Sequence, residues 1–173
     1  MPEDMRIFLG IGSNVNDRYQ NLKMGMRLIN DHPHIWIIEK SYIYQSKAMY
    51  YPEQDDFYNM VIEIETNLNP IQLLDSVKII ERKAGRNTNN SHNMPRTLDL
   101  DILSMGDILI RTNVLEIPHP KIAERKFVLK PWNDIAPTYV VPILNKDISD
   151  LLKITKDISP IDRVLIIDEG QTE

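Results

Sequence analysis

The sequence predicts an α+β fold in which helices flank an antiparallel sheet, in the βαββαβ order of a ferredoxin-like core with C-terminal additions. Strand-like and helix-like segments alternate in that order along the chain. A regular alternation of apolar and acidic residues near its middle marks a strand whose two faces differ. The 173 residues, 42% of them hydrophobic, suffice for one well-buried core and are few for two. We therefore expect a single domain over residues 1–173.

The composition excludes several classes of function. A net charge of −5 argues against a protein that binds the nucleic-acid backbone, because such proteins need a basic surface. Without cysteine the chain can form neither a disulfide framework nor a thiolate zinc site, and its four histidines lack the spacing of metal ligands. No stretch approaches ~18 apolar residues, and the N-terminus lacks the pattern of a signal peptide. We expect a cytoplasmic protein without nucleic-acid or membrane partners.

The first predicted strand, Arg6–Ile11, ends in the motif G-I-G-S-N. Gly10 and Gly12 allow a ligand or another backbone segment to approach closely. The motif begins like a dinucleotide-binding fingerprint, but the third glycine of G-x-G-x-x-G would fall at Val15, so that class is excluded. A tight strand-to-helix turn is the simpler interpretation, and a ligand-lining role is the alternative.

An amphipathic helix is predicted after this turn. Ser13 or Asn14 is expected to begin the turn, and apolar residues recur at helical spacing over Asp17–Asn30. The dipeptide His32-Pro33 ends the helix. A second strand is predicted over Ile35–Tyr44, because β-branched and aromatic residues are frequent there.

A long irregular stretch from Gln45 to Asp56 leads into a third predicted strand, Phe57–Thr66. Loops of this length in compact domains tend to carry function. Phe57 and Asn59 share one strand face, where an aromatic ring beside a carboxamide can stack on a flat heterocycle and hydrogen-bond to its edge. A core phenylalanine and a strand-end asparagine are the alternative.

A second helix is predicted between Asn69-Pro70, which opens it, and Ala84-Gly85, which closes it. The following segment, Arg86 to Met94, is too polar to be buried. It leads directly into the acidic strand. We interpret it either as a mobile flap over a site or as a plain surface loop.

The acidic strand lies in the motif P-R-T-L-D-L-D-I-L, from Pro95 to Leu103. Asp99 and Asp101 are two residues apart and therefore share a strand face. Like charges on one face repel each other unless a cation or an arginine neutralises them, and two such carboxylates can bind one divalent cation or bridge a pair. The alternative is a solvated strand edge with an Arg96–Asp99 ion pair.

The last third of the chain adds shorter elements. A turn at Met105-Gly106-Asp107 precedes a paired strand over Ile108–Arg111. The motif I-P-H-P holds His119 between two prolines, which restricts its backbone. Arg125 and Phe127 lie in the helix-like segment that follows. The expected tail elements are a short helix from Asp147 and a strand over Val164–Ile167, before an acidic end.

Together these motifs resemble those of the 6-hydroxymethyl-7,8-dihydropterin pyrophosphokinases, enzymes of folate biosynthesis. The resemblance rests on F-L-G-I-G-S-N, D-F-Y-N, P-R-T-L-D-L-D-I-L, and I-P-H-P with a downstream R-K-F, in this order, from Ile7 to about Ile143. It implies a monomer that binds ATP and the pterin and transfers the terminal diphosphate of ATP to the pterin hydroxymethyl group, leaving AMP.

The resemblance also implies a role for each site residue. Asp99 and Asp101 would bind two Mg²⁺ ions and would form the catalytic group with Arg86 and Arg96. The residues implied to contact ATP are Lys78, Arg86, Arg96, Ile102, His119 and Arg125. The pterin would lie between Phe57 and Phe127. The residues implied to surround its edge are Asn59 and the loop residues Ser46, Lys47, Ala48 and Met49.

The chain departs from the family pattern in three places, none of which includes the metal-binding pair. The atypical residues are Thr88, His92, Asn93 and Met94 in the predicted flap, Pro120 where an aromatic residue is frequent, and Lys78 where a glutamine is common. We therefore expect the activity to survive with altered kinetics.

Two other classes of function stay open. A nucleotide- or pterin-binding module without catalysis is compatible with the atypical flap. A glycosyltransferase could use D-x-D to hold a nucleotide-sugar, but that class leaves Arg96, Asn59 and the I-P-H-P turn unexplained.

The chain contains no Walker loop, G-x-x-x-x-G-K-[ST], so a bound triphosphate must be held by metal ions and side chains.

Overall fold

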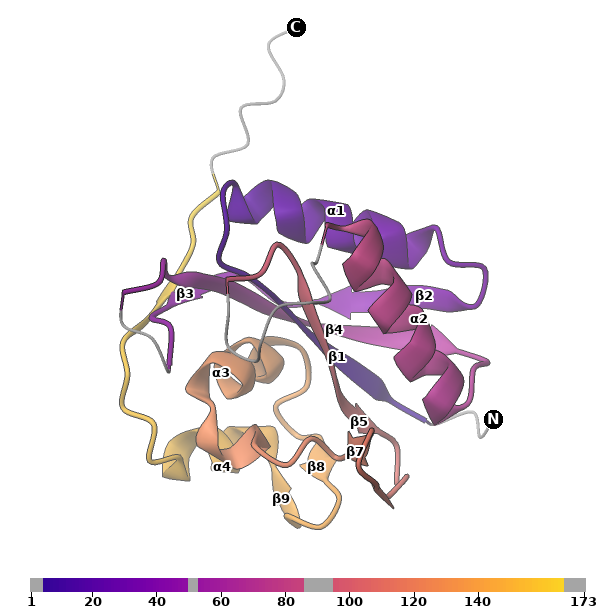
Figure 1. Cartoon of the computed structure of the whole chain (residues 1–173). Helices are drawn as coiled ribbons and strands as arrows, with labels where there is room; N and C mark the ends of the chain where they lie inside the picture. Colours follow the sequence, from indigo (N-terminus) through magenta and orange to yellow (C-terminus); the bar gives the residue numbers. More distant parts are fainter. Residues whose placement is uncertain (1–4, 50–52, 86–94, 167–173) are drawn as a thin grey trace, which may run out of the picture.

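The computed structural model describes residues 5–49, 53–85 and 95–166. Its centre is an antiparallel sheet with helices on both faces (Figure 1). Strand β1 lies between β4 and β5, while β2 and β3 pair with the far edge of β4, and β10 pairs with β3. The predicted α+β class with an antiparallel sheet is confirmed. The strands of this sheet are β1 (Ile7–Ser13), β2 (Ile35–Lys40), β3 (Tyr44–Ser46), β4 (Phe57–Thr66), β5 (Asp99–Met105) and β10 (Ile161–Arg163).

The helices cover the two faces in pairs. Helices α1 and α2 lie on one face of the sheet and α3 and α4 on the other (Figure 1). The helices are α1 (Arg18–Asn30), α2 (Pro70–Lys83), α3 (Lys126–Ile135) and α4 (Ile148–Ile154). The short elements are β6 (Ile110–Arg111), β7 (Glu116–Ile117), η1 (Ile122–Glu124), β8 (Val140–Val141) and β9 (Lys146–Asp147).

Alternation along β1 gives each face its own core. Leu9 and Ile11 point toward α1 and α2 and are almost fully buried there, whereas Phe8 packs against Trp132 of α3 on the opposite face. Burial of a side chain of this size contributes roughly 1.5–3 kcal/mol. The two helix layers therefore pack on opposite apolar faces of β1. On the face toward α3, the glycines interrupt the apolar side chains.

Side-chain caps fix the starts of the first two helices where the sequence predicts them. The carboxylate of Asp17 accepts from the N–H of Gln20 at 3.1 Å. Asn69 forms a capping box with Gln72, and Pro70 occupies the first helical position. These bonds satisfy N–H groups that have no partner within the helix.

The single strand predicted over Ile35–Tyr44 is wrong, because the chain forms β2 and β3 with a break between them. Both pair with β4 on the same edge. At the break, the hydroxyl of Ser41 accepts from the N–H of Val61 at 2.9 Å and so takes the place of a backbone acceptor. The side chain thus satisfies the ladder while the backbone changes course.

Two shorter predictions need correction as well. The strand predicted over Ile108–Arg111 is reduced to β6, which pairs with β7 because Thr112 turns the chain through bonds to Leu115. The tail strand is β10, which ends before Val164 because its partner β3 is only three residues long. Ile167 and the acidic end lie outside the described residues.

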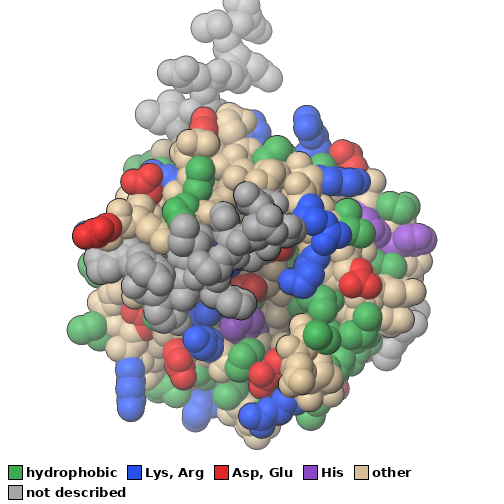
Figure 2. Space-filling model, in the orientation of Figure 1, with side chains coloured by type: hydrophobic (Ala, Val, Ile, Leu, Met, Phe, Trp, Pro, Cys, Tyr) green, Lys and Arg blue, Asp and Glu red, His purple; other side chains and the backbone are tan. Residues whose placement is uncertain are grey.

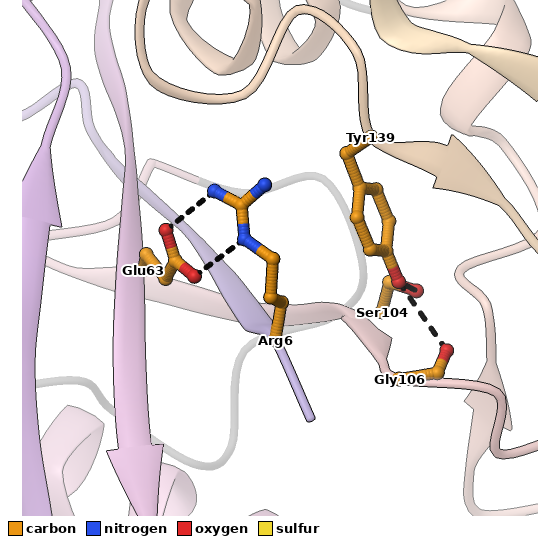
Figure 3. A network of polar contacts seen from close by, with 5 residues as sticks. All are labelled: Arg6, Glu63, Ser104, Gly106 and Tyr139. Carbon is orange, nitrogen blue, oxygen red and sulfur yellow. Dashed lines mark hydrogen bonds and ion pairs between the residues drawn. The ribbon is translucent and has the colours of Figure 1, made fainter. Parts of the chain in front are cut away.

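A polar network ties the C-terminal segment to the sheet (Figure 3). The guanidinium of Arg6 donates twice to the carboxylate of Glu63, at 2.7 Å each, and lies 5.9 Å from the ring of Tyr139. The Tyr139 hydroxyl is 2.8 Å from the hydroxyl of Ser104 and donates to the carbonyl of Gly106. These bonds hold the segment after α3 against the same sheet face on which α3 packs.

Acidic and basic side chains are intermingled over the face in Figure 2. Within the parts of the chain that the structure describes, no helix combines the length and apolar character needed to cross a membrane.

Candidate active site

A cavity lies on the sheet face that carries α3, above the end of β1. About 830 Å³ of empty space, part of it open to solvent, lies between the sheet and the segments around it. The predicted site residues that line it are Ser46, Lys47, Ala48, Met49, Phe57, Asn59, Arg96, Asp99, Asp101, Arg125 and Phe127.

Two glycines of β1 form the floor of this cavity. The strand register places Gly12 between Asn59 of β4 and Asp99 of β5, and it places Gly10 beside Asp101. Residues opposite each other in neighbouring strands point to the same face. Since glycine has no side chain, β1 leaves a trough between the carboxylates on one strand and the aromatic and amide groups on the other.

The close-approach role predicted for the glycines applies most strictly at Gly12. A Cβ atom there would lie 2.8 Å from Oδ1 of Asn59, which is closer than van der Waals contact allows. A Cβ at Gly10 would meet Leu103 at 3.5 Å, an ordinary contact. Gly12 therefore makes room for the Asn59 carboxamide.

Asp99 and Asp101 lie on one wall of the trough, each near a guanidinium. Nη1 of Arg96 donates to Oδ1 of Asp99 at 2.7 Å, and Nη1 of Arg125 lies 3.8 Å from Oδ2 of Asp101. The ion pair of the alternative interpretation is thus present, but its residues line a cavity. Desolvation and the charge of Asp99 raise the pKa of Asp101 to about 7, although Arg125 opposes this shift.

The carboxylate pair also offers oxygen ligands suited to a metal cation. Magnesium is bound in many enzymes by one or two carboxylates together with substrate phosphates and water. In the described parts of the chain, no group of three or more His, Cys, Asp or Glu side chains is placed to hold a metal ion. The donor set at Asp99 and Asp101 therefore fits a magnesium ion that phosphate oxygens also coordinate, and it fits poorly with a metal held by protein alone.

Arg125 offers a further unused group. Its Nε is buried and makes no hydrogen bond with the residues that the structure describes. Its guanidinium carbon lies 5.6 Å from the centre of the Phe127 ring. A buried donor without a partner is costly, so an anion such as a phosphate oxygen would be stabilised here.

Other side chains around the cavity have the composition of a heterocycle site. The side chain of Asn59 is 8% exposed, and its Nδ2 donates to the hydroxyl of Ser46 at 3.1 Å. The rings of Phe57 and Phe127 are half-buried and border the same cavity. Two aromatic faces with an oriented carboxamide between them can hold a flat ring and distinguish its edge.

Three predicted ATP contacts do not line this cavity. Lys78 is exposed on α2, the side chain of Ile102 is buried among α1 and α2, and His119 is half-buried and not among the lining residues. Arg86, together with the flap predicted through Met94, lies outside the described residues.

The imidazole of His119 is neutral, with its Nδ1 used as a hydrogen-bond acceptor. Its Nδ1 accepts from the N–H of Lys121 at 3.1 Å, which leaves the proton of a neutral ring on Nε2. Burial and the charge of Arg125 lower its pKa to about 4. The ring is therefore uncharged at neutral pH in the free protein.

Two residues that the sequence interpretation did not assign support the site. Glu81 of α2 is 3% exposed, and its Oε1 accepts at 2.8 Å from the N–H of Leu100, the residue between the two aspartates. A charged residue at the apolar spacing of Val77 and Ile80 was the available signal. Gln54 lines the cavity as well, but it lies in an irregular stretch without a pattern that marks it.

Comparison with known proteins shows the family of the chain. The model of the family 7,8-dihydro-6-hydroxymethylpterin-pyrophosphokinase (HPPK) matches residues 8–137. The chain is 39% identical over 128 residues to a 2-amino-4-hydroxy-6-hydroxymethyldihydropteridine pyrophosphokinase of Bacillus subtilis, covering 74% of this chain and 76% of the relative. An Aquifex aeolicus protein of the same name is 35% identical, with 83% and 88% covered.

Longer proteins match as well. The folic acid synthesis protein FOL1 of Dictyostelium discoideum is 40% identical over 139 residues, which are 80% of this chain but 21% of that protein. The chain thus spans about a fifth of the length of such relatives. The crystal structure of Plasmodium falciparum HPPK-DHPS with pteroate has a TM-score of 0.70 at 18% identity, over 86% of this chain and 42% of that one, which shows a common fold. On the extent of the family match and the identity to relatives of similar length, this chain belongs to the 7,8-dihydro-6-hydroxymethylpterin-pyrophosphokinase family.

Proposed function

We propose that this protein transfers the terminal diphosphate of ATP to the hydroxymethyl group of 6-hydroxymethyl-7,8-dihydropterin, in folate biosynthesis. One observation carries the proposal: the glycine trough of β1 separates the carboxylates of β5, with guanidinium groups beside them, from the aromatic ring of Phe57 and the oriented amide of Asn59 on β4. A nucleotide triphosphate and a pterin need these two environments, and they must lie side by side. The relatives of similar length carry the name of this activity.

The transfer makes and breaks one phosphorus–oxygen bond. The hydroxymethyl oxygen bonds to the β-phosphorus of ATP, and the bond from that phosphorus to the oxygen shared with the α-phosphorus breaks. AMP leaves with that oxygen and the electron pair, and the hydroxyl proton is released. Such reactions ask a protein mainly for positioning and charge neutralisation.

The chain's own groups supply both requirements. Arg96 and Arg125 face the cavity beside the carboxylates and can contact phosphate oxygens bidentately. Phe57, Phe127 and Asn59 would orient the pterin so that its hydroxymethyl group points along the trough. Two Mg²⁺ ions held by Asp99 and Asp101 would neutralise the charge of the triphosphate.

Further contacts belong to the same proposal. Arg86 and the neutral Nε2–H of His119 would contact ATP, and Lys78 and the main chain of Ile102 would do so at its periphery. We also infer that the core is ferredoxin-like. The strand order β5-β1-β4, with β2 and β3 beyond β4 and with α1 and α2 on one face, supports that topology.

Analysis of the nucleotide product tests the proposal. The protein is incubated with ATP, Mg²⁺ and 6-hydroxymethyl-7,8-dihydropterin, and the nucleotides and pterins are separated. We expect AMP and a pterin diphosphate in equal amounts. ADP as the product would mean an ordinary kinase, and unchanged ATP would favour a binding module without catalysis. AMP that also forms without pterin would indicate hydrolysis.

A further inference from the structure

Asn14 is a buried carboxamide that bonds to two parts of the cavity wall without lining the cavity itself. It directly follows β1 and is 2% exposed. Its Oδ1 accepts from the N–H of Arg96 at 2.7 Å, and its own N–H donates to the carbonyl of Arg96 at 3.1 Å. Its Nδ2 donates to Oε1 of Gln54 at 3.0 Å. Asn14 therefore hydrogen-bonds to two segments of the chain that are far apart in the sequence, one at Gln54 and one at Arg96.

These bonds determine the orientation of the carboxamide. The backbone N–H of Arg96 can only donate, so the oxygen of Asn14 must face it, and the amide nitrogen must face Gln54. Asn14 does not cap α1, because Asp17 does so. Asn14 follows β1 where the turn begins, as the sequence predicts, and the cap of α1 is a different residue.

Both partners of Asn14 need an external support. Gln54 and Arg96 line the cavity, but neither belongs to a helix or strand. Regular backbone pairing thus fixes neither of them. β1, in contrast, is paired on both edges, with β4 and with β5. Because Asn14 directly follows this well-paired strand, its hydrogen bonds can hold the segments of Gln54 and Arg96 in fixed positions.

We propose that Asn14 is a positioning residue for the transfer, holding Arg96 beside Asp99 and Gln54 in the cavity wall at one fixed separation. The inference rests on the proposed function for the reaction that it serves. Through Arg96 it sets the guanidinium that bonds to Asp99, and through Gln54 it sets the wall near Phe57 and Asn59. A shift of about 1 Å in such groups can cost about 10²-fold in rate.

Asn14→Ala removes both side-chain bonds. We expect it to lower kcat by about ten- to a hundredfold, while Asn14→Asp restores most of this loss. The aspartate keeps an acceptor for the N–H of Arg96, the bond through which the guanidinium is positioned. If Asn14→Ala does not fold, Asn14→Ser replaces it, because the shorter hydroxyl cannot reach both partners.

Asn21→Ala is the matched control. The Asn21 carboxamide donates to the hydroxyl of Ser13 at 3.0 Å and to the carbonyl of Val15 at 2.7 Å, so it stabilises the same turn without a bond to the cavity wall. This variant should lose thermal stability but keep kcat within about twofold of wild type. If Asn14→Ala loses as much thermal stability as Asn21→Ala but keeps the wild-type kcat, the proposal is overturned.

A double-mutant cycle with Arg96→Ala separates positioning from general stabilisation. If Asn14 acts through Arg96, Asn14→Ala should change kcat little further once the guanidinium is gone. Full additivity of the two losses would contradict the proposal. If the wild-type protein forms no AMP, the proposed function fails by itself, and calorimetry with a non-hydrolysable ATP analogue and Mg²⁺ then decides on Asn14. Weaker binding in Asn14→Ala than in Asn21→Ala would support the positioning role, and equal binding would overturn it.

Discussion

At the scale of single residues, Asp101 occupies a position that is unfavourable for its ionised form. Asp101 lies close to another carboxylate, and its pKa is raised to about 7 by desolvation and by the charge of Asp99. A group in this condition is stabilised by a bound cation. The repulsion that the free protein tolerates is consistent with a site prepared for metal-bound triphosphate.

Asp99→Asn and Asp101→Asn should each leave the fold intact and lower turnover by several orders of magnitude. Each change removes an anionic ligand and leaves triphosphate charge without its counter-ion. Steady-state kinetics across a range of Mg²⁺ concentrations would show the loss, with circular dichroism as the control for folding. Turnover near the wild-type value in either variant would refute the metal assignment.

Phe127→Ala should weaken pterin binding by roughly 1–3 kcal/mol, the value of one stacked aromatic face. The affinity for a non-hydrolysable ATP analogue should change little, and calorimetry with each ligand compares the two effects. Phe127→Leu is the matched variant, because it restores bulk but not the aromatic face. Equal losses for both ligands would mean that the ring supports the fold instead.

Among the elements, β1 contributes both to the core and to the cavity. On the face that points toward α3, it carries one core residue followed by two glycines. Phe8 packs on Trp132, whereas Gly10 and Gly12 leave the trough open. Its neighbours β4 and β5 carry the functional side chains. The site is thus positioned by backbone pairing of three strands, and the loops around it complete it.

Gly12→Ala should raise the KM for the pterin by roughly tenfold, equivalent to about 1.4 kcal/mol. The new methyl group would lie 2.8 Å from Oδ1 of Asn59 and would displace the carboxamide that we propose contacts the pterin. Gly10→Ala is the control, since its methyl group would make an ordinary contact with Leu103 at 3.5 Å. An equal KM for the pterin in the two variants would argue against this role of Gly12.

Local patterns carried most of the information that the sequence could provide about these elements. Period-two alternation revealed the faces of β4 and β5, and hence Phe57 with Asn59 and Asp99 with Asp101. The break at Ser41 and the pairing of β6 with β7 were not predictable in this way, because side-chain hydrogen bonds to the backbone decide them. Such bonds depend on which strand lies opposite.

The supporting residues were missed for a related reason. Asn14 and Gln54 meet across 40 positions of sequence, and their bond exists only once β1 and β4 are paired. Glu81 gave a local signal, a carboxylate on the apolar face of a helix, but its partner at Leu100 could not be inferred from spacing. Long-range contacts of this kind follow from the assembled sheet and not from any one segment.

For the whole molecule, the raised pKa of Asp101 links the active site to global stability. The native protein retains this proton between about pH 4 and pH 7, where the unfolded chain has released it. The contribution to the free energy of unfolding is therefore present at low pH and lost as the pH rises through about 7.

Asp101→Asn should accordingly become more stable than wild type as the pH rises from about 4 to about 7, because asparagine cannot ionise. Urea denaturation of both proteins without Mg²⁺ or nucleotide, at several pH values in this range, measures the difference. A difference in unfolding free energy that stays constant with pH would contradict the raised pKa. We expect the variant to be inactive, so stability and function are opposed at this residue.

The proposed transfer requires that the pterin hydroxymethyl group attacks the β-phosphorus of ATP. Transfer from ATP carrying a radioactive β-phosphorus tests this most directly, because the label reports which bond breaks. We expect the label to leave the nucleotide completely and to be recovered in a pterin diphosphate, with unlabelled AMP. Label retained in ADP beside a pterin monophosphate would show attack at the γ-phosphorus and would contradict it.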